Sequence, residues 1–437
     1  MAYPVYASED SRWLGRLPSH WREARIAHMA TAWTSNVDKH SVEGESPVRL
    51  CNYTDVYKND QVVGSMAFMA ATATHDQISR FRLRAGDTLI TKDSETADDI
   101  GIPAFVEYEA DDLICGYHLA MIRPHAYVCD PRFLYWAMAS EPTLRQWGVL
   151  AAGVTRVGIR SSDLPKASIP RPPLPEQRAI TDYLDRQTAQ IDTLVGKQER
   201  LIETLRERRA AVVSKVIDQG ESRVAFRRAV IHLRQGWSPN CEPDAADGVT
   251  EWGVLKTGCS NRGVFRPSEN KRLPATEVPR SEHVIGRNEI IMSRASSRDW
   301  VGSASRVDGS YPRLMLSDLT YGLTLRTGVD PRFVVHMLGS TRSRGLLEAA
   351  AKGTSPSMQK LSQRDIRELP VWIPPALDEQ RRIADHLDEQ TTKIDLLIAK
   401  AERFIELAKE RRSALITAAV TGQIDVRPES MKEAGAA

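Results

Sequence analysis

The segment PEQRAITDYLDRQTAQID at residues 175–192 is nearly repeated as DEQRRIADHLDEQTTKID at residues 378–395. From 175 to 378 the offset is 203 residues, and it continues without a gap into the arginine-rich segments around Glu207 and Glu410. A match this long indicates that one structural unit occurs twice in the chain.

Apolar residues in both copies recur at intervals of three and four, which is the spacing of a coiled-coil seam. Prolines precede each copy and favour a helix start there. A helix of ~43 residues extends about 64 Å, which is too long to pack on one domain alone. We therefore predict that the two helices pair as an antiparallel coiled coil. The predicted seam consists of Ile180, Leu184, Ile191, Leu194, Leu201, Leu205 and Val212 in the first copy, and of Ile383, Leu387, Ile394, Leu397, Phe404, Ala408 and Leu415 in the second.

The regions before the two helices match more weakly. Each contains an apolar strand followed by Asp-Pro-Arg-Phe, in which Asp130 or Asp330 suits a helix N-cap. The predicted fold is α+β, with two globules that alternate with two long helices about a pseudo-twofold axis that places the globules at opposite ends. The predicted boundaries are 1–170 and 221–370 for the globules, 171–220 and 371–425 for the helical regions, and 426–437 for a disordered tail.

Composition narrows the class of protein. A chain of 437 residues exceeds what one core usually serves. Its five cysteines lack a C-x-x-C spacing, and no apolar run reaches the ~18 residues that span a bilayer. These features favour a cytoplasmic protein with reduced cysteines.

The sequence shows no catalytic constellation. The pair Gly196-Lys197 lacks the upstream glycine of a phosphate-binding loop, and the segment Gly258–Gly263 is one residue too long for a nucleophile elbow. Histidines are scattered singly, and no metal-ligand set is complete. We therefore expect no enzyme activity and no metal or cofactor in this chain.

Basic and polar residues near the strand ends of the globules are the candidates for DNA contacts, because arginine, asparagine, serine and threonine bind bases and phosphates. Residues 1–170 hold 17 basic and 21 acidic residues, whereas 221–370 hold 23 and 16. The alternation of Arg80, Arg82 and Arg84 predicts a strand with all three on one face. The complete set is Arg80, Arg82, Arg84, Lys92, Ser94, Arg156, Arg160, Lys256, Ser260, Asn261, Arg262, Ser293, Arg294, Ser296, Ser297, Arg298, Lys352, Thr354, Ser355, Ser357 and Lys360.

The chain resembles the DNA sequence-specificity subunits of Type I restriction-modification systems. The resemblance rests on Pro173–Ile180, on the Thr-x-x-Ile-Asp steps at 188–192 and 391–395, and on the Glu-Arg-Arg-x-Ala segments. The segments WLGRLPSHW (13–21) and QGWSP (235–239) add to it and resemble the openings of the N-terminal and second recognition regions.

The resemblance implies a non-catalytic adaptor. Its two globules are expected to be target recognition domains that each read half of a bipartite target in double-stranded DNA. Its helices are expected to set the spacer and to dock two modification subunits, which bind S-adenosylmethionine and methylate adenine N6, with restriction and translocase subunits joining for cleavage. The rival from another class is a coiled-coil scaffold that binds only proteins. A methyltransferase acting alone is disfavoured, since the chain lacks an Asp/Asn-Pro-Pro-aromatic signature.

Overall fold

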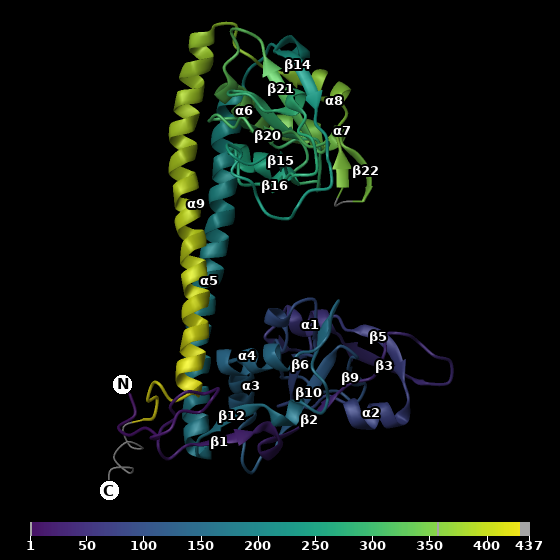
Figure 1. Cartoon of the computed structure of the whole chain (residues 1–437), viewed down its shortest axis with the longest axis vertical. Helices are drawn as coiled ribbons and strands as arrows, with labels where there is room; N and C mark the ends of the chain where they lie inside the picture. Colours follow the sequence, from purple (N-terminus) through teal and green to yellow (C-terminus); the bar gives the residue numbers. More distant parts are fainter. Residues whose placement is uncertain (1, 356–357, 429–437) are drawn as a thin grey trace. The chain divides into compact units, whose positions relative to one another are not determined.

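The computed structural model describes residues 2–355 and 358–428. The chain divides into two compact units, of which unit 1 contains residues 1–197 and 404–437 and unit 2 contains residues 198–403. The long helices α5 (Leu174–Ile217) and α9 (Leu377–Val420) each continue from one unit into the other. Each unit is therefore a globule together with segments of both helices (Figure 1).

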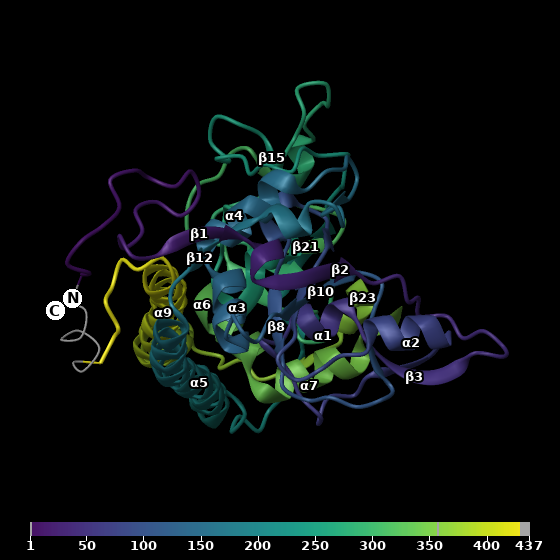
Figure 2. The same cartoon turned by 90° about the horizontal axis from the view of Figure 1, so that it is seen from below.

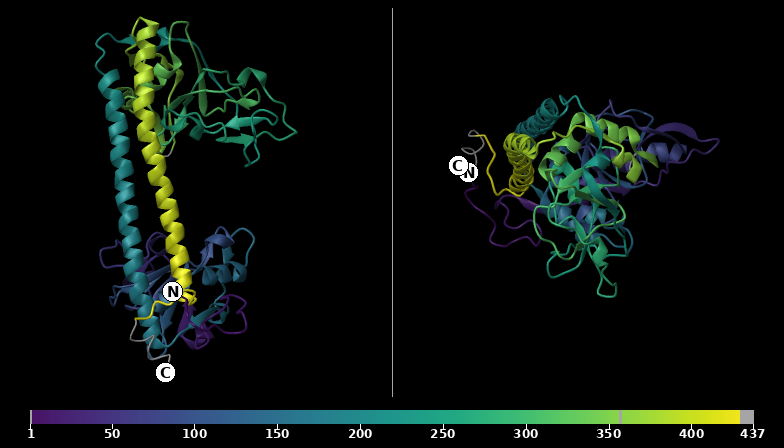
Figure 3. Two further views of the ribbon diagram at one scale, coloured as in Figure 1. Left: turned by 90° about the vertical axis from the view of Figure 1, so that its left-hand side faces the viewer. Right: turned by 90° about the horizontal axis from the view of Figure 1, so that it is seen from above.

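Helices α5 and α9 contact each other and run side by side in two views (Figures 1 and 3). The first part of α5 belongs with the last part of α9 in unit 1, and the reverse holds in unit 2, so the pair is antiparallel as predicted. The buried or half-buried seam positions are Leu184, Thr188, Ile191, Val195, Gln198, Ile202, Leu205, Arg209, Val212 and Val216 on α5, and Leu387, Thr391, Ile394, Ile398, Ala401, Ile405, Ala408, Arg412, Leu415 and Ala419 on α9. Every α9 position lies 203 residues after its α5 counterpart.

Four predicted seam residues are wrong, because Leu194, Leu201, Leu397 and Phe404 are exposed. Four of the ten observed seam positions on α5 agree with the prediction, namely Leu184, Ile191, Leu205 and Val212. Elsewhere on α5 the seam residue is the one after the predicted residue: Val195 takes the place of Leu194, and Ile202 takes the place of Leu201. Both frames satisfy a three-and-four spacing, because the apolar stripe is three residues wide per heptad.

The globule of unit 1 is built on a five-stranded sheet in the order β2-β10-β6-β8-β4, with a three-stranded sheet β5-β3-β9 and the pairs β1-β12 and β7-β11. Its elements are β1 (Arg22–Arg25), β2 (Ala30–Thr34), β3 (Ser46–Cys51), α1 (Tyr53–Tyr57), β4 (Gln61–Val62), β5 (Met69–Ala73), α2 (His75–Phe81), β6 (Thr88–Thr91), β7 (Asp93–Ser94), β8 (Pro103–Val106), β9 (Leu113–Cys115), β10 (Leu119–Pro124), α3 (Pro131–Ala139), α4 (Glu141–Leu150), β11 (Val157–Gly158) and β12 (Ser168–Arg171). Helices α3 and α4 lie near the long helices, whereas β3 and α2 lie on the far side of the globule (Figure 2).

The globule of unit 2 repeats this plan with a four-stranded sheet β14-β21-β17-β19, the three-stranded sheets β16-β15-β20 and β18-β23-β22, and the pair β13-β24. Its elements are β13 (Val224–Ala225), β14 (Val230–Gln235), β15 (Gly253–Leu255), β16 (Asn270–Arg272), β17 (Ile290–Ser293), β18 (Ala295–Ser296), β19 (Ala304–Arg306), β20 (Leu314–Met315), β21 (Thr320–Leu325), α6 (Pro331–Gly339), α7 (Thr341–Ala350), β22 (Lys352–Ser355), β23 (Met358–Lys360), α8 (Gln363–Arg367) and β24 (Pro370–Val371). The strand order of the central sheet and the parallel pairs β3-β9 and β15-β20 are the same in both units.

Aspartates cap the helices that face the coiled coil, as the sequence predicts. The side chain of Asp130 accepts from the backbone N–H groups of Arg132 and Phe133, and Asp330 does the same for Arg332 and Phe333. A proline follows each cap in the first turn, where its missing N–H costs no hydrogen bond. A short helix also precedes each proline segment, since Asp163 comes directly before a 3-10 turn and Asp365 lies in α8.

A glutamine at the start of each long helix fastens the globule to the coil. Gln177 Nε2 donates to the carbonyls of Val128 and Pro172, and its Oε1 accepts from the N–H of Asp130. Gln380 makes the same three bonds in unit 2, to Gly328, Pro374 and Asp330. The repeated Glu-Gln-Arg motif therefore contains a buried glutamine that makes these bonds in both units. We call Gln177 and Gln380, with these bonds, the glutamine latch.

Unit 1 also holds both described ends of the chain. Tyr3 Oη and Trp21 Nε1 donate to the buried carboxylate of Glu176 at 3.1 and 2.9 Å, so the tryptophan segment packs on the start of α5. Arg427 lies over the ring of Tyr3, 4.7 Å from its centroid. The tail was predicted to begin at residue 426, and residues 429–437 lie outside the described part of the chain. No helix of the described residues is long and apolar enough to cross a membrane.

Candidate nucleic-acid interface

Each globule carries a β-hairpin on the same short strand. In unit 1 the first hairpin, Ala152–Gly158, pairs with β7 through Val157 opposite Ser94 and Gly158 opposite Asp93. In unit 2 the second hairpin, formed by β22 and β23, pairs with β18 through Gln359 opposite Ser296. The backbone bonds Ile159 N–H to Lys92 O and Leu361 N–H to Arg294 O, at 2.8 and 3.0 Å, occur at equivalent places.

A glycine at the second position allows each hairpin to close. A Cβ on Gly153 would lie 1.9 Å from the carbonyl oxygen of Arg156, and one on Gly353 would lie 2.3 Å from that of Met358. Gly153 also has a φ of +150°, which side chains disfavour. The two glycine-led motifs are thus structurally equivalent.

The first hairpin gathers several predicted DNA-binding residues of unit 1. Val154 is fully exposed, and Arg156 and Arg160 are exposed as well. Lys92 lies behind the hairpin, its Nζ 4.3 Å from the centroid of the exposed Tyr117 ring. Residues 151–160 contain two arginines and no acidic residue, although their globule is acidic.

Tyr53 was not among the predicted residues, yet it lies at the base of this hairpin. Its side chain hydrogen-bonds to Ser94 and lies within electrostatic reach of Arg156. Burial raises the pKa of Tyr53, and the carboxylate of Asp99 adds to the rise. The neutral phenol of Tyr53 therefore lies beside the basic hairpin. The sequence does not show this position, because it depends on the pairing of β7 with β11.

Arg80, Arg82 and Arg84 do not share a face of a strand, which corrects the prediction. Thr74 and Gln77 form a capping box that starts helix α2, so Arg80 is helical and Arg82 follows the last turn. Arg82 pairs with Asp111 at 2.7 Å, and Arg84 is exposed.

Several predicted serines and one arginine have structural roles in unit 2. Ser260 and Ser293 are fully buried, and Ser260 donates to the carbonyl of Ser303. Ser94 of unit 1 is buried too. Arg262 lies in the left-handed region, with a φ of 61°, and pairs with Glu402 of α9 at 3.3 Å. Ser260 and Arg262 thus make bonds within unit 2, and a direct contact with DNA is wrong for the serines whose side chains are buried, Ser94, Ser260 and Ser293.

The remaining predicted residues of unit 2 lie near the second hairpin or the adjoining turn. Arg294 donates to Tyr321 Oη and to the carbonyl of Asp318, which fixes its side chain. Asn261 has a buried Oδ1 without a partner. Arg298, Lys352 and Lys360 are exposed, and Lys256, Ser296, Ser297 and Ser355 are half-buried. The side chain of Thr354 and the whole of Ser357 lie outside the described part of the chain.

A hollow recurs where each globule meets the coiled coil. In unit 2 a hollow of about 370 Å³ is lined by Arg209, Arg332, His336, Asp388, Thr391 and Asp395, among others. In unit 1 a hollow of about 510 Å³ is lined by their counterparts Arg412, Arg132, Trp136, Asp185, Thr188 and Asp192. Five of these six positions keep the same residue type in both units.

The ion pairs in these hollows follow the same repeat. Arg209 Nε lies 2.8 Å from Asp395 Oδ1, and Arg412 Nε lies 3.1 Å from Asp192 Oδ1. Arg412 also pairs with Asp60 of the unit 1 globule, so its side chain joins both helices to that globule.

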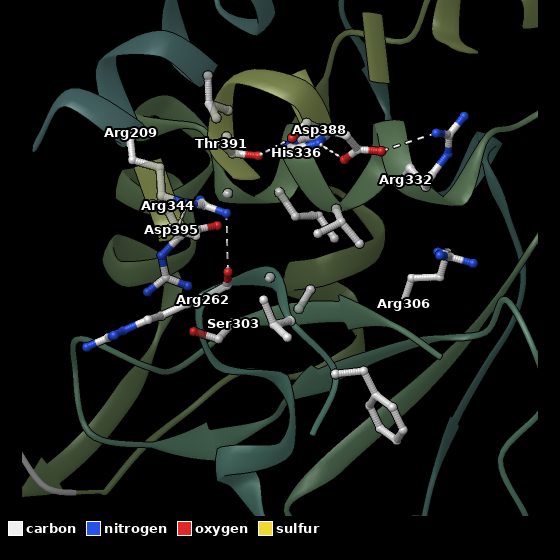
Figure 4. A pocket seen from close by; sticks show the side chains of 18 of the residues that line it. Arg209, Arg262, Ser303, Arg306, Arg332, His336, Arg344, Asp388, Thr391 and Asp395 are labelled. Atoms are coloured by element: carbon white, nitrogen blue, oxygen red, sulfur yellow. Dashed lines mark hydrogen bonds and ion pairs between the residues drawn. The ribbon is translucent and has the colours of Figure 1, made fainter. Parts of the chain in front are cut away.

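Asp388 lies between His336 and Arg332, whose nitrogens are 2.7 and 3.2 Å from its oxygens (Figure 4). Burial opposes the ionisation of Asp388, but the hydrogen bond and charge of His336, aided by Arg332, outweigh it and hold the pKa of Asp388 below its ordinary value. In unit 1 Trp136 Nε1 donates to the equivalent Asp185 at 2.9 Å. Within residues 2–355 and 358–428, no group of three or more histidine, cysteine or acidic residues could hold a metal ion.

Comparison with known proteins assigns the family. Residues 49–203 match the Type I restriction modification DNA specificity domain. This region carries a Type I specificity domain. The matched region runs from β3 to the middle of α5, which includes the first hairpin and the first hollow.

Two relatives illustrate the range of this family. The specificity subunit of the Type I restriction enzyme EcoEI of Escherichia coli is 29% identical over 147 residues, which are 33% of this chain and a quarter (25%) of the relative. The putative specificity subunit of the type I restriction enzyme MjaX of Methanocaldococcus jannaschii is 26% identical over 80% of this chain and 81% of its own.

A chain with the same fold occurs in a solved structure that concerns the complex assembly and conformational transition of the type I R-M system. The TM-score is 0.65 at 18% sequence identity, over 93% of this chain and 99% of that chain. The specificity-subunit fold thus extends to the second half of this chain, beyond the residues that match the family domain.

Proposed function

We propose that this specificity subunit reads a bipartite sequence in double-stranded DNA, with one half-site for each globule, and presents two modification subunits to it. The observation that carries the proposal is the contrast between the two copies. The coiled-coil seam, the glutamine latch and the charged hollow recur at equivalent positions, whereas the hairpins differ in sequence and length. A repeated face suits one partner bound twice, and different hairpins suit two different half-sites.

The exposed leucines of the coil support two protein partners. Leu194 and Leu397 occupy equivalent positions and are 45 and 50% exposed, and Leu201 and Phe404 form a second equivalent pair. On an otherwise charged helix, large apolar side chains at a heptad spacing favour packing against a further helix. We call these four residues the outer stripe.

The division of labour follows from the family resemblance. The modification subunits are proposed to bind S-adenosylmethionine and to methylate adenine N6, and the restriction and translocase subunits are proposed to join them for cleavage. This chain is proposed to contribute DNA recognition and docking but no bond-breaking step, in the cytoplasm of the host cell.

The proposal is tested by exchanging residues 1–170 for the first recognition domain of another family member. Single-molecule sequencing of N6-methyladenine in cells that express the hybrid with its modification subunit is expected to show one altered half-site and one unchanged. Alteration of both half-sites would contradict the modular assignment. DNA binding that stays non-specific in an intact complex would favour a protein scaffold.

A further inference from the structure

The two hairpins are the parts of the globules that combine a shared frame with unshared tips. The first hairpin follows α4 and pairs with β7, and the second follows α7 and pairs with β18. In both units the paired strand comes directly after a strand of the main sheet, β6 or β17. The tip of the first hairpin is Gly-Val-Thr-Arg, whereas the described residues of the second include Gln359 and Lys360, and the second is two residues longer between its paired ends.

Charge and exposure distinguish the first hairpin from the rest of its globule. Unit 1 has more acidic than basic residues within 1–170, yet residues 151–160 carry Arg156 and Arg160 and no acidic residue. Residues 351–361 likewise carry two lysines and no acidic residue. A polyanion therefore meets the first hairpin at a lower electrostatic cost than the rest of its acidic globule, whereas the second hairpin belongs to a globule that is net basic over 221–370.

The shape of a hairpin fits the major groove. Two paired strands lie about 4.8 Å apart, and the major groove of B-DNA, about 12 Å wide, admits a two-stranded β-ribbon. The first hairpin is a short loop closed by the single bridge between Ala152 and Gly158, and Gly153 lets the chain pass close to the carbonyl of Arg156. In Figure 1, β22 lies on the side of its globule away from α9, so the ribbon is not covered by the coil.

We propose, on the basis of the function proposed above, that the first hairpin enters the major groove and reads part of one half-site. The Arg156 guanidinium donates two hydrogen bonds to the O6 and N7 of a guanine, and Val154 contacts base edges, such as a thymine methyl group. Arg160 contacts a phosphate beside the hairpin, and Tyr53 supports the base of the hairpin.

The test uses the complex of the full chain with its modification subunits and S-adenosylmethionine. Methylation rates are measured on duplexes in which each base pair of the wild-type motif is replaced in turn. Arg156→Ala is expected to lower discrimination at one base pair of one half-site by roughly ten- to a hundredfold. Arg145→Ala, which removes an exposed arginine of α4 outside the hairpin, is the matched control and is expected to keep the wild-type pattern.

A second variant keeps the proposal testable if Arg156→Ala misfolds. Val154→Ala with Thr155→Ala shortens exposed side chains only and is expected to change preference within the same half-site, while the other half-site stays intact as an internal control. Unchanged discrimination at every position in both variants would overturn the proposal. Reduced recovery of the modification subunit with unchanged discrimination would also overturn it and assign the hairpin to a protein contact. A wild-type complex that methylates no split motif would instead refute the function on which the proposal rests.

Discussion

At the scale of single residues, the glutamines of the repeated motif explain why the motif is repeated. Gln177 and Gln380 each satisfy one carbonyl and one N–H in the turn before α3 or α6, and one proline carbonyl just before their own long helix. The groups that bond Gln177 belong to buried or half-buried residues, so loss of the amide leaves them without this partner away from bulk water. The identity of the two glutamines therefore follows from backbone geometry, whichever sequence the globule above them reads.

Replacing Gln177 by methionine is expected to destabilise unit 1 by about 2 kcal/mol, because it strands a buried N–H and two carbonyls while keeping the side-chain volume. Urea denaturation followed by tryptophan fluorescence measures the change. Gln190→Met, at an exposed position of α5, is the control and is expected to stay within about 0.5 kcal/mol of the parent. Equal stability of the two variants would show that the latch contributes nothing.

Asp388 gives unit 2 a pH dependence in the acid range. Its pKa is lower in the folded chain than in the unfolded chain, so its ionised form stabilises the fold above its unfolded pKa. That stabilisation is lost as the pH falls through the folded value. The difference in unfolding free energy between the parent and Asp388→Asn is therefore expected to shrink between pH 5 and pH 3. A difference that is constant over this range would contradict the assignment.

At the scale of elements, the coiled coil shows three apolar positions per heptad where a two-stranded seam uses two. The seam takes Val195, Ile202, Ile398 and Ile405, and the outer stripe stays exposed. Exposed apolar surface that recurs at equivalent positions on both helices is the pattern expected when the same helix of a partner docks twice.

Charging the outer stripe tests this docking face. The double variant Leu194→Glu, Leu397→Glu is expected to lose co-purification with the modification subunit, because a carboxylate at a packed interface costs its hydration. Its own thermal stability is expected to remain within a few degrees of the parent, since both side chains are solvent-exposed. Ala210→Glu, at another exposed position of α5, is the control. Full recovery of the partner with the double variant would rule out the stripe as its docking face.

The elements also show where sequence reasoning succeeds and fails. The long helices, their pairing, the caps Asp130 and Asp330 and the strands before them follow from spacing and local chemistry, which the sequence displays directly. The choice of residues that face the partner helix does not follow from the sequence, because two sets of seam positions one residue apart fit the same apolar stripe. Burial of Ser260 and Ser293 and the helix at Arg80 depend on tertiary packing and on the Thr74 cap, so the DNA-contact prediction was least accurate there.

At the scale of the whole molecule, the internal repeat accounts for both parts of the proposed function. The two units share topology, latch and hollow. They differ in the hairpins and in the residue that bonds the half-buried aspartate of the hollow, which is Trp136 in unit 1 and His336 in unit 2. One duplicated frame can therefore present the same partner twice while its globules read two different sequences.

The most direct measurement of this claim is the N6-methyladenine map of a cell that expresses the chain with its modification subunit. The account predicts a split motif with two specific half-sites separated by a non-specific spacer, and one modified adenine on each strand. A stable complex that binds S-adenosylmethionine but leaves the DNA unmethylated, or that modifies only a continuous, undivided motif, would contradict it.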